Sequence, residues 1–219
     1  MRIGARTLGW AGMAVLALVL AGQAQEADGS RFVVDGTRLI FDTEIEGDEY
    51  PDEIVNADID RFRAALADNP DVTELELNSS GGSVYAGQEL AWIVMDYGLN
   101  TLVVGECTSA CVDVFLAGSR RRMALGSKIG FHRRHWSPEA VASYYDDQRE
   151  DFGWDSPFDY GSWIYDDTQQ EIFEHLTYMI DRGVAPAFAV RTMQPEAADV
   201  WYPNRLQLMA GGVLRETVD

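Results

Sequence analysis

Apolar and polar positions follow two alternating periods between residues 38 and 131. Residues 38–45 alternate as a half-buried strand does, whereas residues 55–68 carry Ile59, Phe62 and Leu66 at the spacing of one helix face. Strands that alternate with helices predict an α/β fold of repeated βαβ units, with much of its sheet parallel. The remaining segments of this pattern are strands at 72–77, 101–104, 122–125 and 128–131 and helices at 84–97 and 109–118.

Residues 144–174 interrupt this pattern. The segment holds ten acidic and nine aromatic residues in 31 positions, so we expect an inserted acidic-aromatic helical segment. It is either a solvated excursion with a small core of its own, or a surface that contacts another protomer or the substrate. After it, apolar residues at helical spacing predict a helix over 164–182 that ends before Gly183.

Composition favours one ordinary globular domain. The chain has 219 residues, of which 47% are apolar and 24% charged, values typical of a folded domain that buries a core. Its formal net charge is -19. Because this charge repels phosphate backbones, nucleic acid is not expected as a partner.

The first 24 residues have the pattern of a secretory signal peptide. Arg2 and Arg6 precede an almost wholly apolar run, residues 8–21, and small residues at positions 22 and 24 suit a signal peptidase. The run is shorter than the roughly 20 residues that cross a bilayer, so retained membrane anchoring is the weaker alternative. We therefore expect a periplasmic or secreted mature domain over 25–219 that begins near Gln25.

Three short segments could carry chemistry. The first, Asn78–Gly82, ends in two glycines that let backbone amides approach an anion, although a plain strand-to-helix turn would look the same. The second places Ser109 at a strand-to-helix junction, where it could be a nucleophile or only a helix N-cap. The third ends a strand at His132, which with His135 supplies the bases nearest the expected core.

Cys107 and Cys111 bracket Ser109 and are the only cysteines in the sequence. Residues four apart at a helix start have Cα atoms about 6 Å apart, within the range of a disulfide. In an oxidising compartment the pair could form this bond, or remain two buried thiols that pack as small apolar groups.

No metal or cofactor is expected. The sequence lacks HExxH, paired CxxC motifs, GxGxxG and the phosphate-binding GxxxxGK[ST].

Taken together, the segments resemble a known family. Asn-Ser-x-Gly-Gly-x-Val-x-x-Gly over Asn78–Gly87, Phe-Leu-Ala-Gly-x-x-Arg over Phe115–Arg121 and Gly-x-His over Gly130–His132 are similar to the proteolytic subunit of Clp protease. Asp199-Val200-Trp201 resembles that family's Asp-x-aromatic segment. The Cys-x-Ser-Ala-Cys junction on an exported chain resembles the periplasmic branch of the ClpP/crotonase-like superfamily. The resemblance covers about 38–132 and 195–214, and implies a ClpP/crotonase-like fold.

The resemblance also implies residue roles. Ser109 would be the nucleophile, His132 the general base and Asp199 the carboxylate that orients the base. The register of the helix 164–182 instead favours Asp181 as a solvent-facing partner of Arg182. The amides of Gly82 and Ala110 would form the oxyanion hole. The implied activity is that of a serine-type endopeptidase that hydrolyses peptides or unfolded protein.

The resemblance and the expected export together bear on partners. A homo-oligomer is compatible with the family, but an ATP-driven AAA+ unfoldase is not expected, since ATP is not supplied outside the membrane. The alternative is a non-catalytic ClpP-like module that binds a partner protein through 144–174. An acyl-CoA enzyme on the same superfold is disfavoured because CoA is cytosolic and its phosphates would be repelled.

Overall fold

The computed structural model describes residues 30–45 and 50–216. The expected signal peptide, residues 1–24, and the expected mature N-terminus at Gln25 lie outside the described residues. Within those two ranges, no helix has both the length and the apolar character needed to cross a membrane.

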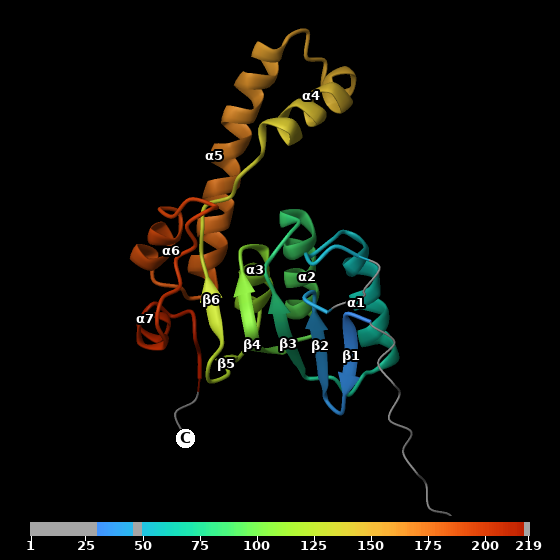
Figure 1. Ribbon diagram of the computed structural model, residues 1–219, viewed down its shortest axis with the longest axis vertical. Helices are drawn as coiled ribbons and strands as arrows, with labels where there is room; N and C mark the ends of the chain where they lie inside the picture. The colour runs from blue at the N-terminus through green and yellow to red at the C-terminus, as the bar shows by residue number, and fades with distance from the viewer. Residues whose placement is uncertain (1–29, 46–49, 217–219) are drawn as a thin grey trace, which may run out of the picture.

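A mixed sheet of six strands forms the centre of the described structure (Figure 1). Its order is β1-β2-β3-β4-β5, and β6 also pairs with β4. The β1–β2 pair is antiparallel and every other pair is parallel. The strands are β1 (Phe32–Asp35), β2 (Arg38–Asp42), β3 (Glu74–Ser79), β4 (Asn100–Thr108), β5 (Arg121–Met123) and β6 (Lys128–Gly130).

Helices connect the central parallel strands, and the expected mixed α/β class is confirmed. α1 (Ala57–Asp68) lies between β2 and β3 in sequence, and α2 (Val84–Asp96) lies between β3 and β4. α3 (Ala110–Leu116) follows β4 directly and has every side chain buried. The expected helix face of α1 is inside the core, where Phe62 and Leu66 pack with the apolar residues of β2 and β3. Burial of these faces is the main source of stability.

The two short strands after α3 do not pair with each other. β5 pairs with the first half of β4, at Thr101–Val103, whereas β6 pairs with its second half, at Glu106–Thr108. β4 is therefore longer than the 101–104 segment expected from the apolar pattern. Gly105, with φ of 95°, marks an irregularity in the middle of β4 that places the second half beside β6. This arrangement brings the ends of β4 and β6 together.

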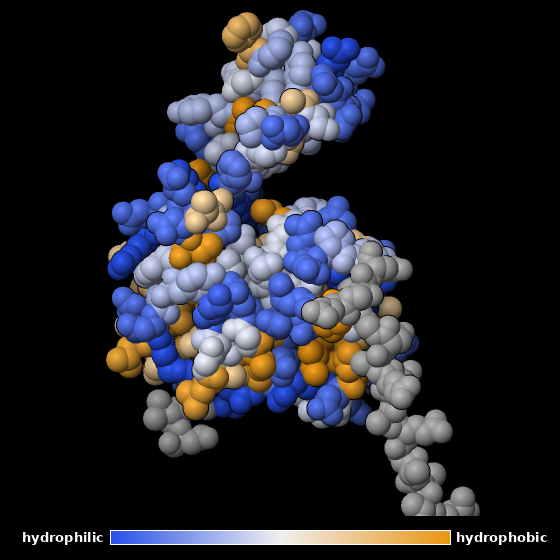
Figure 2. Space-filling model, viewed as in Figure 1, coloured by the Kyte–Doolittle hydropathy of each residue, from blue (hydrophilic) through white to orange (hydrophobic). Residues whose placement is uncertain are grey.

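α4 (Pro138–Phe152) and α5 (Pro157–Asp181) form a helical arm that projects from the body (Figures 1 and 2). Each begins with a Ser-Pro pair whose serine caps the first turn, and Gly153 ends α4 in a left-handed conformation. Ser156 and Asp159 form a capping box, which explains why α5 begins well before residue 164. α6 (Pro186–Thr192) and α7 (Arg205–Ala210) lie near the base of α5.

Aromatic side chains of 144–174 pack against one another inside the arm. Trp154 and Tyr160 are buried, with ring centroids 4.8 Å apart, and Trp163 lies 5.0 Å from Trp154. Phe158 and Tyr165 point outward and are exposed. The segment thus has a small core of its own as well as single exposed aromatic side chains on a largely hydrophilic surface (Figure 2).

Candidate functional site

Ser109 occupies the sharp junction between β4 and α3. Its φ of 57° and ψ of -126° make it the one non-glycine residue with positive φ in the described part of the chain. Such backbone conformations cost on the order of 1–3 kcal/mol, and they persist where surrounding structure imposes them. The Ser109 hydroxyl caps no amide of α3. The helix-cap alternative therefore does not account for this serine.

The glycine-rich turn after β3 packs directly against Ser109. A Cβ atom at Gly81 would lie 2.7 Å from the Ser109 Cβ and 3.3 Å from the Ala110 nitrogen. A Cβ at Gly82 would lie 2.4 Å from the carbonyl oxygen of Ile54. Both glycines also have positive φ, so side chains are excluded here by space and by backbone conformation.

The amides of Gly82 and Ala110 are available to a ligand. Among residues 30–45 and 50–216, neither amide donates a hydrogen bond to any protein acceptor. Two unpaired amides beside a strained serine are suited to receive a negatively charged oxygen.

His132 follows β6 and lines the same small cavity as Ser109 and Ala110, with a volume of about 30 Å³. The amide of Ser109 donates to the carbonyl of Gly130 at 3.3 Å, which ties the two segments together. His132 Nδ1 lies 2.8 Å from the carbonyl oxygen of Arg133. Because a carbonyl can only accept, Nδ1 is the donor in this contact, and Nε2 is the ring nitrogen left for other partners. No side-chain hydrogen bond between Ser109 and His132 is present in the described residues.

Asp199 lies in the loop before Trp201, and its side chain is exposed. Paired amides and carbonyls of Phe131 and Trp201, each at 2.9 Å, hold this loop beside the His132 segment. Asp199 lines a different cavity, with Glu196, and in the described structure it forms no hydrogen bond with His132. Its orienting role therefore stays a prediction.

Asp181 is exposed at the end of α5, as expected. The expected pairing with Arg182 is wrong, because the Arg182 guanidinium reaches the carbonyls of Leu116 and Ala117 at 3.0 and 2.8 Å. Both carbonyls lie at the C-terminal end of α3, where backbone acceptors lack intrahelical donors, and that of Leu116 also accepts from Arg121 at 3.0 Å.

Cys107 and Cys111 form a disulfide whose Cα atoms are 5.3 Å apart, and both residues are buried. The bond joins the C-terminal end of β4 to the first turn of α3. It therefore closes a short loop around Ser109.

A charged cluster that sequence reasoning missed, made of Asp113, Arg134 and His175, also lines the Ser109 cavity. Asp113, one helical turn after Ser109, accepts from Arg134 at 3.1 Å, and Arg134 also donates to Glu171 at 2.6 Å. Arg134 Nη2 lies 3.2 Å from His175 Nδ1. Burial lowers the pKa of His175 against the opposing effect of Asp113, so the imidazole is favoured in its neutral form.

The sequence carried one weak signal for this cluster. Asp113 stands inside the apolar helix 109–118, and a carboxylate inside such a helix requires a buried partner. That the partners come from the β6–α4 connection and from α5 depends on tertiary structure alone. Within the described residues, no three His, Cys, Asp or Glu side chains converge as ligands for a metal ion.

No family model matches the chain, and no curated protein matches it. Among solved structures, the chain is similar to a ClpP1 mutant from Listeria monocytogenes, with a TM-score of 0.47 and 14% sequence identity. The match covers 74% of this chain and 84% of that chain.

Proposed function

We propose that the protein is a serine-type peptidase of the ClpP/crotonase-like superfamily, exported, with Ser109 as its nucleophile. The observation that carries the proposal is the strained backbone of Ser109, held beside two unpaired amides and in one cavity with His132. A strained strand-to-helix turn is how other hydrolase folds present a nucleophilic serine. A module that only binds a partner has no need for this conformation.

The proposed mechanism assigns one task to each group. Ser109 Oγ attacks the carbonyl carbon of the scissile peptide bond while His132 Nε2 takes its proton. The oxygen of the tetrahedral intermediate receives hydrogen bonds from the Gly82 and Ala110 amides. His132 then gives the proton to the leaving amine, and water hydrolyses the acyl-enzyme by the same route in reverse order.

The imidazole must be held in one tautomer for this sequence. In the structure His132 Nδ1 lies 2.8 Å from the Arg133 carbonyl oxygen, and we propose that the Asp199 carboxylate orients the ring in the substrate complex. Substrates are peptides or unfolded chains. Following the sequence analysis, we propose that the enzyme works outside the cytoplasm and without an ATP-driven unfoldase.

A fluorophosphonate probe tests the central assignment, because it labels only an activated serine. We expect the wild-type protein to be labelled and Ser109→Ala to remain unlabelled, with Ser83→Ala, which alters the N-cap of α2, as the matched control that keeps labelling. Absence of label on the wild-type protein, or equal label on Ser109→Ala, would refute the proposal.

A further inference from the structure

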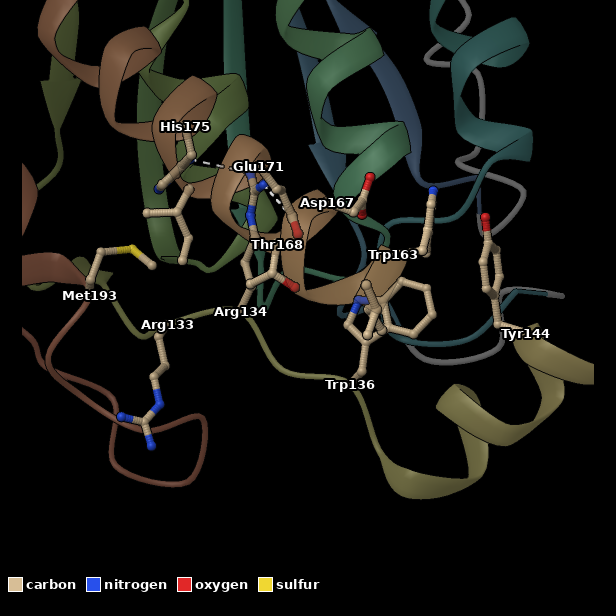
Figure 3. Close-up of a pocket in the computed structure, with 12 residues that line it drawn as sticks. Arg133, Arg134, Trp136, Tyr144, Trp163, Asp167, Thr168, Glu171, His175 and Met193 are labelled. Atoms are coloured by element: carbon tan, nitrogen blue, oxygen red, sulfur yellow. Dashed lines mark hydrogen bonds and ion pairs between the residues drawn. The ribbon is translucent and has the colours of Figure 1, made fainter. Parts of the chain in front are cut away.

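A groove beside the Ser109 cavity has the size of a substrate side-chain site. It lies between α5 and the segment that joins β6 to α4, and its volume is about 510 Å³ (Figure 3). Arg134 and His175 line both this groove and the Ser109 cavity. The Ser109 cavity is too small for a peptide, so a substrate whose carbonyl reaches Ser109 must place neighbouring residues in adjoining space. The groove provides that space.

Aromatic rings form one wall of the groove. Trp136 and Tyr144 have ring centroids 5.3 Å apart, and Tyr144 and Trp163 are stacked at 5.9 Å. Figure 3 shows these three side chains gathered at one end of the groove. Trp136 is about half exposed, so part of this wall remains open to a ligand. Such surfaces accept apolar groups, and they also attract cations to the ring faces.

The two arginines that line the groove already have carboxylate partners. Arg134 is bonded to Asp113 and Glu171, at 3.1 and 2.6 Å, and Arg133 is bonded to Glu196 at 2.9 Å. Neither guanidinium is therefore an unopposed positive charge toward a ligand.

Asp167 supplies a negative charge without a cationic partner. It stands four residues after Trp163 and four before Glu171, so the three share one face of α5. Within the described residues Asp167 forms no ion pair. Burial first, and then the Glu171 and Glu174 carboxylates, raise the pKa of Asp167. A positive charge on a ligand would offset the repulsion between these carboxylates.

We propose that this groove binds the side chain of a lysine or arginine of the peptide substrate, with Asp167 as the residue that selects it. The cationic group would pair with the Asp167 carboxylate, and the aliphatic stem would lie along the rings of Trp136 and Trp163. The formal net charge of -19 also attracts basic peptides to the molecule, which favours the same class of substrate. This inference rests on the proposed peptidase function, because it names the substrate class of that site.

Binding to Ser109→Ala protein, measured by titration calorimetry, tests the groove separately from catalysis. The ligands are blocked pentapeptides of alanine with Lys, Arg, Leu or Glu at the central position. We expect Lys and Arg peptides to bind about tenfold more tightly than the Leu peptide, and the Glu peptide to bind most weakly. Adding Asp167→Asn should abolish the preference for Lys and Arg. The matched change Asp166→Asn, at a neighbouring carboxylate that is exposed like Asp167 but does not line the groove, should preserve it.

A second pair of variants tests the location. Thr168→Trp fills the groove and should weaken binding of every peptide at least tenfold, whereas Gln169→Trp, one position away and outside the lining, should not. Thermal unfolding midpoints confirm that each variant is folded. Equal or tighter binding of the Leu peptide, no binding of any peptide, or an intact preference in Asp167→Asn each overturns the inference. Basic peptides that bind but are not cleaved by the wild-type protein refute only the peptidase assignment.

Discussion

Ser109 combines a strained backbone conformation with the proposed role of nucleophile. Its backbone conformation is one that glycine adopts readily and other residues rarely do, yet glycine has no hydroxyl. The close approach of Gly81 holds the serine in place from the other side. At this scale the proposed chemistry and the backbone strain occur at the same position.

Two substitutions at this position should separate activity from stability. Ser109→Ala and Ser109→Gly should both lose peptidase activity, by as much as about a million-fold, because the nucleophile is gone. Ser109→Gly should raise the free energy of unfolding by about 1 kcal/mol relative to Ser109→Ala, since only glycine relieves the positive φ. Urea unfolding measures this difference. A glycine variant less stable than the alanine variant would contradict the account of strain.

Asp199 provides a second test at the scale of one side chain. Asp199→Asn should keep the fold and lower turnover by about 10⁴, the loss expected when a catalytic histidine is left in the wrong tautomer. Asp181→Asn, at another exposed carboxylate, is the control and should leave kcat unchanged. If Asp199→Asn is fully active, the Arg133 carbonyl alone is sufficient to orient His132.

At the scale of elements, the start of α3 is positioned by the helix that packs on it. A Cβ atom at Gly87 of α2 would lie 2.9 Å from the Ala110 carbonyl oxygen and 3.0 Å from its Cβ. The absence of a side chain at Gly87 therefore sets how closely α2 and α3 approach. A change in that contact would therefore displace the Ala110 amide of the proposed oxyanion hole.

Gly87→Ala should lower kcat at least tenfold, because the added methyl group displaces the first turn of α3. Overpacking of this kind also costs about 1–3 kcal/mol of stability. Gly161→Ala, in α5 where no atom lies within 4 Å of the added Cβ, should instead stabilise the protein by about 1 kcal/mol through helix propensity. Activity assays and urea unfolding of both variants check the contrast. Unchanged kcat in Gly87→Ala would show that the α2–α3 contact does not position the site.

The disulfide joins two elements around the nucleophile, so its reduction should affect the site before the rest of the fold. We expect dithiothreitol to lower kcat of the wild-type protein several-fold while circular dichroism remains unchanged. The double variant Cys107→Ala/Cys111→Ala should have low activity that no longer responds to the reductant. Full activity of this variant would show that the bond is structural only.

At the scale of the whole molecule, the helical arm is tied to the body by buried polar contacts. Tyr178 of α5 donates to the Asp113 carbonyl at 2.6 Å, and the Arg134 network links α5 to α3. Burial keeps the pKa of His175 below its ordinary 6.5. The neutral imidazole is thus part of the connection between arm and body.

This pKa shift predicts a loss of stability in mild acid. The unfolded chain binds a proton at His175 as pH falls through about 6.5, whereas the folded protein does so only at lower pH. The contribution of His175 to the free energy of unfolding should therefore be complete above about pH 6.5. It should decrease as the pH falls from that value to the pKa of the folded state. His175→Gln should show a smaller decrease between pH 7.5 and 5.5, whereas His135→Gln, an exposed histidine, should follow the wild-type protein. Identical pH dependence in all three proteins would exclude His175 as the cause.

The sequence alone was sufficient for the features that depend on local pattern. Alternating periods of two and 3.6 residues predicted the α/β class and the positions of β3, α2 and α3 within a few residues, because burial of one face imposes these periods. Paired glycines after a strand and a serine before a helix indicated where chemistry could be located. Such signals are readable because their physical causes span only a few neighbouring residues.

Only the tertiary structure decided which distant groups meet. Asp113, Arg134 and His175 lie on three different segments, and no local pattern records that they share a buried ion-pair network. The same holds for the groove between the β6–α4 connection and α5, and for the separation of Asp199 from His132. The strain at Ser109 is likewise imposed by packing of Gly81 and by pairing of β4 with β6, not by the serine itself. Contacts of this kind follow from how whole elements pack, which depends on the entire set of buried surfaces at once.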